Sequence, residues 1–267
     1  MDQLTAHRES AVVESQSEEE AGGIGALVEL RLLPAFGLYC GGEMVMLSRG
    51  LQRLLAFLAV ADRAVDRARL AGVLWSDTSE SRATANLRGS LWRLRQTELA
   101  LLEGRGNMLG LHPAVHIDLR CARTHAERLL GRHGGPRPDD LAPRALTNDL
   151  LEDWYDDWLL MERERFRQVR LHALEALCDQ LVQSGRHPEA IEAGLGAVAG
   201  EPFRDSAQRA LIRAYLAEGN VSEAERQYRS YQALLSRSHM AGPAFSLADI
   251  DQGVLRDRPR DQAGVPG

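Results

Sequence analysis

The residues of this chain best suited to chemistry are four arginines within residues 81–96 (SRATANLRGSLWRLRQ), a stretch without any acidic residue. A guanidinium group is always charged, and its planar donors match the acceptor geometry of a phosphate or a guanine edge. At about 100° per residue the stretch forms an amphipathic helix. Its apolar stripe consists of Ala83, Leu87, Leu91 and Leu94. The pattern indicates a basic surface for nucleic acid, unless the arginines only form a solvated face.

Catalytic and metal-binding patterns are weak. The sequence contains no Walker loop, HExxH or GxSxG motif. The pairs His112/His116 and Cys121/His125 have a spacing that could hold a metal on a helix, but neither pair has two further obvious ligands. The first pair is also interrupted by Pro113. We therefore expect no enzymatic activity, no cofactor and no metal site.

Length and composition bound the class of protein. A chain of 267 residues is long enough for two modest domains with buried cores. No apolar run approaches the 18 or more residues that span a bilayer, and the N-terminus lacks a signal-peptide pattern. The three cysteines (Cys40, Cys121 and Cys178) are scattered, which fits a reducing compartment. We expect a cytoplasmic protein without a membrane partner.

The net charge of −6 conceals an uneven distribution. Residues 1–24 hold six acids against one arginine, and they are predicted to be a disordered acidic tail. Residues 29–120 hold twelve arginines against nine acids, a net charge of +3. Residues 251–267 are predicted to be a second disordered tail. The basic excess therefore lies in the segment that contains the arginine-rich helix.

The elements around that helix follow the order of a winged helix-turn-helix. Apolar runs in residues 27–33, 36–40 and 43–47 predict strands, with Gly41-Gly42 as a hairpin turn. Two helices are expected at residues 51–60 and 67–75, the second capped by Asp66. A hairpin around Arg105 and a strand near residues 115–119 follow the arginine-rich helix. The predicted DNA-binding domain covers residues 25–119.

In this architecture the third helix enters the major groove and the hairpin, or wing, touches the DNA backbone. Side chains opposite the apolar stripe are then predicted to contact bases: Arg82, Asn86, Gly89 and Arg93. Flanking groups are predicted to contact the backbone: Arg49, Thr84, Arg88, Ser90, Arg95 and Arg105. For Arg88 and Arg95, ion pairs that brace the domain are the alternative.

The C-terminal half has an internal repeat. Residues 171–204 and 205–238 align with a period of 34 residues, so that Leu177 matches Leu211 and Gly185 matches Gly219. This is the length of a tetratricopeptide repeat, a pair of helices that buries its apolar face against neighbouring pairs. We expect residues 120–250 to form an all-α repeat domain, completed by helices from residues 121–170.

An acidic-aromatic run precedes the repeats. Tentative protein-interaction residues in it are Trp154, Tyr155, Asp156, Asp157 and Trp158. The alternative is that the aromatic side chains belong to the core and that the acids are merely solvated.

Residues 65–75 (VDRARLAGVLW) and 83–95 (ATANLRGSLWRLR) resemble the OmpR-type winged helix of the Streptomyces antibiotic regulatory protein family. The similarity continues through residues 153–158 (DWYDDW) and 162–166 (ERERF) to Tyr231, where the chain resembles that family's bacterial transcriptional activator domain. The resemblance implies a mainly α fold with a small β part. It also implies a sequence-specific activator that binds double-stranded promoter DNA as a homodimer on tandem repeats. RNA polymerase holoenzyme as partner and control of secondary metabolism are implied as well.

Two other classes of function fit the same sequence. The chain could be a repeat-based interaction protein whose winged helix has little or no specific affinity for DNA. Alternatively, the concave surface of the repeats could bind a small molecule and act as a sensor.

Overall fold

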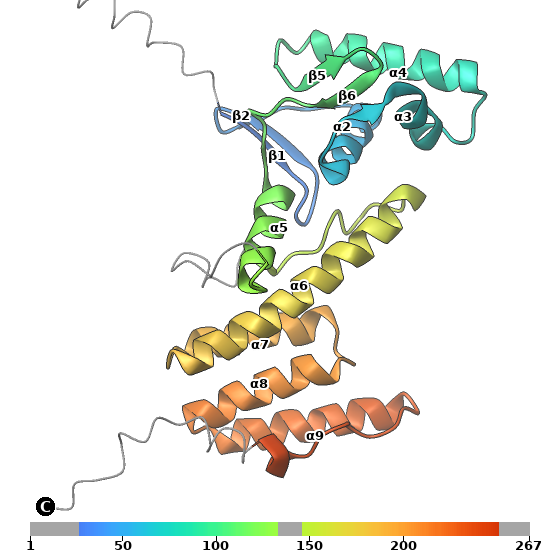
Figure 1. Ribbon diagram of the computed structural model, residues 1–267. Helices are drawn as coiled ribbons and strands as arrows, with labels where there is room; N and C mark the ends of the chain where they lie inside the picture. Colours follow the sequence, from blue (N-terminus) through green and yellow to red (C-terminus); the bar gives the residue numbers. More distant parts are fainter. Residues whose placement is uncertain (1–26, 133–145, 251–267) are drawn as a thin grey trace, which may run out of the picture. The chain divides into compact units, whose positions relative to one another are not determined.

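The computed structural model describes residues 27–132 and 146–250, so both predicted tails lie outside the described residues. The fold is mainly α with a small β part, as predicted (Figure 1). The described chain is divided into two compact units. The first comprises residues 27–31 and 36–117, and the second comprises residues 32–35, 118–132 and 146–250. Within these residues, none of the helices combines the length and apolar character of a membrane span.

A small sheet forms the N-terminal part of the first unit. Its strands are β1 (Val28–Arg31), β2 (Gly37–Cys40), β3 (Glu43–Met44) and β7 (His116–Ile117), arranged in the order β3-β2-β1-β7. β7 runs parallel to β1, whereas the other pairs are antiparallel. Gly41 and Gly42 both have positive φ, 59° and 88°, as a two-residue turn between strands requires. The predicted hairpin is therefore present.

Three helices follow the sheet: α2 (Arg49–Ala61), α3 (Arg67–Leu74) and α4 (Glu80–Arg95). Leucine and alanine side chains of α2 are almost entirely buried, because apolar residues recur on several sides of this helix. α4 packs against both α3 and α2. Its position is thereby fixed by the two helices that the sequence placed before it.

A second sheet carries the wing. It has the order β4-β6-β5, with β4 (Val65–Asp66) between α2 and α3, and with β5 (Leu102–Arg105) and β6 (Met108–Leu111) forming a hairpin. The hairpin closes through Gly106 and Asn107, and Gly106 has a φ of 59°. Glycine is favoured at this first turn position because the backbone is left-handed there. With α2, α3 and α4, this hairpin completes a winged helix-turn-helix.

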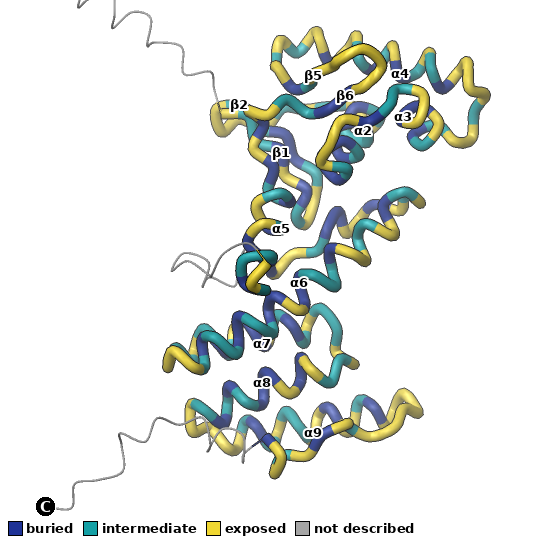
Figure 2. The backbone as a smooth tube through the Cα atoms, viewed as in Figure 1, coloured by how far each residue is buried: buried dark blue, intermediate teal, exposed yellow. Residues whose placement is uncertain are grey.

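The second unit is a stack of helices. α5 (Asp118–Leu129), α6 (Asp157–Gln183), α7 (His187–Gly200), α8 (Asp205–Glu218) and α9 (Val221–Arg237) each pack against the next one along the chain. Buried residues recur along the facing sides of α7 and α8 (Figure 2). This is the expected arrangement of helical repeats, in which each unit buries apolar surface against its neighbours.

The 34-residue period has a direct structural counterpart at the ends of α6 and α8. Gly185 and Gly219 both have positive φ, 72° and 91°. After α6, the amides of Gly185 and Arg186 donate to the carbonyls of Val182 and Leu181. Residues 34 positions later make the equivalent bonds after α8, so both helices end in a Schellman motif.

Two details characterise the second repeat, at the start of α9 and at its end. α9 begins at Val221 with Asn220 as its N-cap, and Glu225 pairs with Arg229. In the first repeat, α7 ends at Gly200 and Pro202 lies in the linker that follows. At the equivalent position of the second repeat, Ser236, α9 is still helical. The reason is that serine, unlike proline, keeps the backbone N–H and allows helical φ.

Gly194 permits an especially close approach of α7 to α8. A Cβ atom added at this glycine would lie 3.0 Å from Leu211 Cα and 3.1 Å from Leu211 Cβ. These distances leave no room for a side chain without a shift of one helix. The repeat contact is thus a backbone-level fit.

Segment 32–35 belongs to the second unit because backbone hydrogen bonds hold it there. The carboxylate of Asp118, in the first turn of α5, accepts the amides of Leu32 at 2.9 Å and Leu33 at 3.0 Å. The carbonyls of Leu32 and Pro34 in turn accept the amides of Leu151 and Glu152, both at 3.0 Å. The predicted domain boundary, after residue 119, did not separate this segment from the strands.

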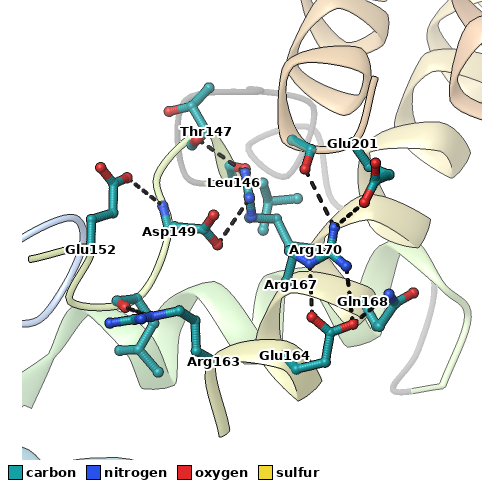
Figure 3. Close-up of polar contacts among 12 residues, drawn as sticks. Leu146, Thr147, Asp149, Glu152, Arg163, Glu164, Arg167, Gln168, Arg170 and Glu201 are labelled. Carbon is teal, nitrogen blue, oxygen red and sulfur yellow. Dashed lines mark hydrogen bonds and ion pairs between the residues drawn. The ribbon is translucent and has the colours of Figure 1, made fainter. Parts of the chain in front are cut away.

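Arginines of α6 hold the segment that precedes this helix (Figure 3). Arg163 donates to the carbonyls of Leu150, Leu151 and Trp154. Arg170, only 2% exposed, donates to the carbonyls of Leu146 and Thr147 and pairs with Asp149 at 3.0 Å. Backbone carbonyls that would otherwise lack partners away from water are satisfied in this way.

The end of the described chain covers the last repeat. Phe245 and Ile250, 8% and 5% exposed, join a cluster with Tyr231 and Leu235 of α9. The rings of Phe245 and Tyr231 are stacked with centroids 6.3 Å apart. Residues after α9 therefore bury the outer apolar side of α9 and α8, which a terminal repeat must cover.

We expect Arg170→Leu to lower the free energy of unfolding of the helical unit by about 3–5 kcal/mol, because Asp149 and two carbonyls would lose their buried partner. Urea titration followed by circular dichroism measures this change. Arg165→Leu is the matched control, since Arg165 is 69% exposed and pairs with Glu162 at the surface. Its effect should stay within about 1 kcal/mol. Equal effects of both substitutions would contradict the buried role.

Candidate nucleic-acid interface

One side of α4 is fixed in the core of the first unit. Ala83, Leu87 and Leu94 are 2–3% exposed, as the predicted apolar stripe requires. Ser90 is also buried, with 1% exposure, whereas Leu91 is only half-buried. Ser90 was predicted to contact the DNA backbone, and that prediction is wrong in this structure because its hydroxyl lies on the packed side of the helix.

The burial of Ser90 in place of Leu91 rotates the exposed face of α4 relative to the predicted one. Its central part contains Ala85, Arg88 and Trp92, which are all exposed. Arg88, predicted to lie on a flank, is thus a central residue. Arg82 and Arg93 are exposed toward one edge of this face, and Arg95 toward the other. The remaining predicted contacts on the helix, Thr84, Asn86 and Gly89, are half-buried.

The charges of α4 are ordered along its length. Its single acid, Glu80, lies in the first turn, and Arg93 and Arg95 lie in the last turn. Both placements are favourable for the helix dipole, whose positive end is at the N-terminus. Arg93 also donates to the hydroxyl of Ser90 at 3.4 Å. Beyond the first turn, the exposed face therefore carries positive charge without a neutralising acid from the same helix.

The wing is attached to the N-terminus of α3 through Asp66. The Asp66 carboxylate accepts the amides of Ala68 at 2.9 Å and Arg69 at 3.1 Å, which caps the helix as predicted. It also accepts the side-chain amide of Asn107 from the wing turn, while the carbonyl of Asn107 accepts the amide of Arg67 at 3.0 Å. The amide of Arg69 contributes most to lowering the pKa of this carboxyl.

Two predicted backbone contacts lie outside α4, and both are exposed. Arg105 is the last residue of β5, next to the wing turn. Arg49 is the first residue of α2. The attachment of the wing turn to α3 gives Arg105 a defined location on the same unit as α4.

Trp92 also lies on this face, although it was not among the residues predicted to contact DNA. Its side chain is 64% exposed, although it belongs to the helix with the four arginines. A signal was available, because Trp92 lies four residues after Arg88 and three before Arg95, a spacing that places all three on one side of a helix.

The acidic-aromatic run divides between core and surface. Trp154 is 5% exposed and belongs to the core, so its predicted role in protein interaction is wrong. Trp158 is half-buried and donates to Asp156 at 3.3 Å. In contrast, Tyr155 is 87% exposed and Asp157 is exposed as well. Exposed Leu160 and Met161, on the first turns of α6, extend this surface.

The residues considered for metal binding are not assembled into a site. Within residues 27–132 and 146–250, no three His, Cys, Asp or Glu side chains are grouped as metal ligands. His125 is buried in α5, whereas Cys121 is exposed.

The third cysteine, Cys178, is buried, and this burial is the main cause that raises the pKa of its thiol to about 12. That thiol therefore remains protonated near neutral pH.

Comparisons with known proteins give a family match within the second unit and relatives that align with most of the chain. Residues 142–255 match the bacterial transcriptional activator domain family. Regulatory protein AfsR of Streptomyces griseus is 26% identical over 241 residues, which cover 83% of this chain and 24% of that protein. AfsR of Streptomyces coelicolor is 26% identical over 256 residues, covering 91% and 25%. The chain thus spans about a quarter of the length of these relatives.

Among solved structures, Mycobacterium tuberculosis EmbR in complex with a low affinity phosphopeptide has the same fold. The TM-score is 0.65 at 20% sequence identity, and the match covers 88% of this chain and 67% of that chain. A winged helix-turn-helix with a bacterial transcriptional activator domain defines a class of bacterial transcriptional regulators. Residues 142–255 thus form a bacterial transcriptional activator domain, and the chain as a whole is similar to the Streptomyces regulatory proteins AfsR.

We expect Asp66→Ala to lower the thermal unfolding midpoint of the first unit, since one residue both caps α3 and holds the wing turn. The lowered pKa means that this stabilisation is present above the ordinary value of 3.8 and is lost as the pH falls through the folded-state value. The difference in midpoint between the wild type and the variant should therefore be constant near neutral pH and shrink in acid. Calorimetry across this range measures it. A difference that grows in acid would contradict the assignment.

Proposed function

We propose that the chain is a sequence-specific DNA-binding activator of transcription. The observation that carries this proposal is the exposed face of α4, where four arginines occur with a single acid confined to the first turn. An α-helix fits the major groove, which is about 12 Å wide, and arginine can bond there to guanine O6 and N7. The wing residue Arg105 then contacts a phosphate.

The charge distribution of the first unit supports the same proposal. Its described residues hold eleven arginines against eight acids, although the whole chain is acidic. A basic surface on one domain provides the sequence-independent part of DNA affinity through release of counterions. Specificity must come from base contacts, for which the exposed arginines of α4 are the candidates.

Further parts of the proposal concern partners. We infer that two copies bind direct repeats at a promoter, and that the helical unit contacts RNA polymerase. The AfsR relatives are named as regulatory proteins, which supports a regulatory role. We further propose that this role is in the cytoplasm and controls secondary metabolism, as the family resemblance implies. A gel-shift assay with promoter fragments at several salt concentrations tests the central claim. Equal affinity for promoter and unrelated DNA would favour an interaction protein without specific DNA binding.

Substitution of arginines should separate base contacts from phosphate contacts. We expect Arg88→Ala and Arg93→Ala to reduce discrimination between promoter and unrelated DNA by about 1–3 kcal/mol, because they remove hydrogen bonds to base edges. Arg105→Ala should weaken binding to all sequences alike and reduce the salt slope by about one. Fluorescence anisotropy with both DNAs measures these changes. The division into two classes is wrong if all three variants lose specific and unspecific affinity equally.

The exposed part of the acidic-aromatic run is proposed as a protein contact. Tyr155, Leu160 and Met161 expose between 52% and 87% of their surface beside the exposed acids Asp153 and Asp157. Aromatic and methionine side chains are enriched at interfaces, and surrounding carboxylates select a basic partner surface. We therefore assign this surface to the contact with the transcription machinery.

Tyr155→Ala should reduce promoter output several-fold in a reconstituted transcription assay and leave affinity for promoter DNA unchanged. The physical reason is the loss of a large exposed ring that is not needed to bury the core. Arg165→Ala, an exposed substitution on α6, the helix that follows Tyr155, is the matched control and should have little effect. Unchanged output of Tyr155→Ala would remove this surface from the proposal.

A further inference from the structure

Trp92 occupies a position that core packing does not explain. The indole is 64% exposed at the centre of the outward face of α4, opposite the stripe formed by Ala83, Leu87, Ser90 and Leu94. A single exposed apolar residue is ordinary on a protein surface. Here, however, the ring has an arginine on its own side of the helix both one turn before and one turn after it, at Arg88 and Arg95.

The surroundings of Trp92 leave space for a ligand beside the ring. Gly89 lies three residues earlier, and a Cβ atom added there would meet no heavy atom within 4 Å. Ala85, seven residues earlier on the same side, is exposed and small. Small residues next to a large exposed ring allow the helix backbone to come close to a base-pair edge, while the indole extends deeper into the major groove.

The chemistry of the ring selects one group in the major groove. Phosphates and most base edges offer charge or hydrogen-bond partners, which suit the arginines. The 5-methyl group of thymine is the apolar feature of the major groove, and it is bound by apolar side chains. Because an indole is large and mainly apolar, it gains most from covering that methyl group.

We propose that Trp92 is a specificity-determining residue that recognises a thymine through contact with its 5-methyl group. The proposal rests on the proposed function, since it requires that α4 enters the major groove. It adds a base preference that the arginines do not provide, because a guanidinium group bonds preferentially to guanine.

The test removes the methyl group from the DNA and the ring from the protein. In a bound promoter fragment, each thymine is replaced in turn by deoxyuridine, and affinity is measured by fluorescence anisotropy for the wild type and for Trp92→Ala. At one or two positions the wild type should lose about three- to tenfold in affinity, as expected for an uncovered methyl group. Trp92→Ala should lose a similar factor on the thymine fragment and show no further loss on the deoxyuridine fragment.

Two further variants serve as controls. Trp92→Phe keeps an apolar ring and should retain much of the preference for thymine. Arg105→Ala should weaken binding to both fragments and leave their ratio unchanged. Because Trp92 is exposed, all variants are expected to keep the circular dichroism spectrum of the wild type.

The outcomes separate this inference from the proposed function. If the wild type prefers its promoter but is insensitive to deoxyuridine at every position, the thymine contact is overturned and the proposed function stands. The same holds if Trp92→Ala keeps the full difference between thymine and deoxyuridine, or if it loses transcription with unchanged DNA affinity, as a protein contact would. If the wild type has no promoter preference, the proposed function itself fails and the thymine contact fails with it.

Discussion

The geometry of the first unit depends on the hydrogen bonds of one carboxylate, that of Asp66. It satisfies two otherwise unpaired amides at the N-terminus of α3 and binds the side chain of Asn107 at the tip of the wing. Pairing of β4 with β6 supports the same junction. Because α4 packs directly on α3, one junction determines where both the wing and the arginine-rich helix are held. This unit can therefore present Arg105 and the exposed face of α4 as one preformed surface.

Packing of α4 also decides which chemistry its face offers. The buried stripe ends in Ser90 and Leu94, so Arg88 and Trp92 occupy the centre of the exposed side. Positive charge alone would give affinity for any DNA, whereas hydrogen-bonding and apolar groups on the same face can distinguish bases. The mixture of arginines with one large aromatic ring is what gives this helix the means to be selective.

The helical unit solves a different problem, which is to close both ends of a short repeat stack. At one end, Arg163 and Arg170 satisfy carbonyls of the segment that precedes α6. At the other end, Phe245 and Ile250 cover the outer side of α8 and α9. Repeats bury apolar surface only against neighbours, so such terminal elements are needed for a stable stack. Exposed Tyr155 and Met161 are not part of that closure, which leaves them available for contacts.

The sequence by itself determined the features that depend on local spacing: the helix periods, the Asp66 cap, the glycine turns and the 34-residue repeat. Tertiary structure decided which side of each helix is covered. Ser90 and Leu91 lie on opposite edges of the apolar stripe of α4, about 100° apart, and in the packed unit the serine is buried while the leucine is only half-buried. Trp154 and Tyr155 are adjacent aromatics, yet one is in the core and the other is exposed. Likewise, segment 32–35 joins the second unit through Asp118 and Leu151, which are distant in sequence. Spacing fixes the angle between side chains, but burial depends on neighbours that no local pattern specifies.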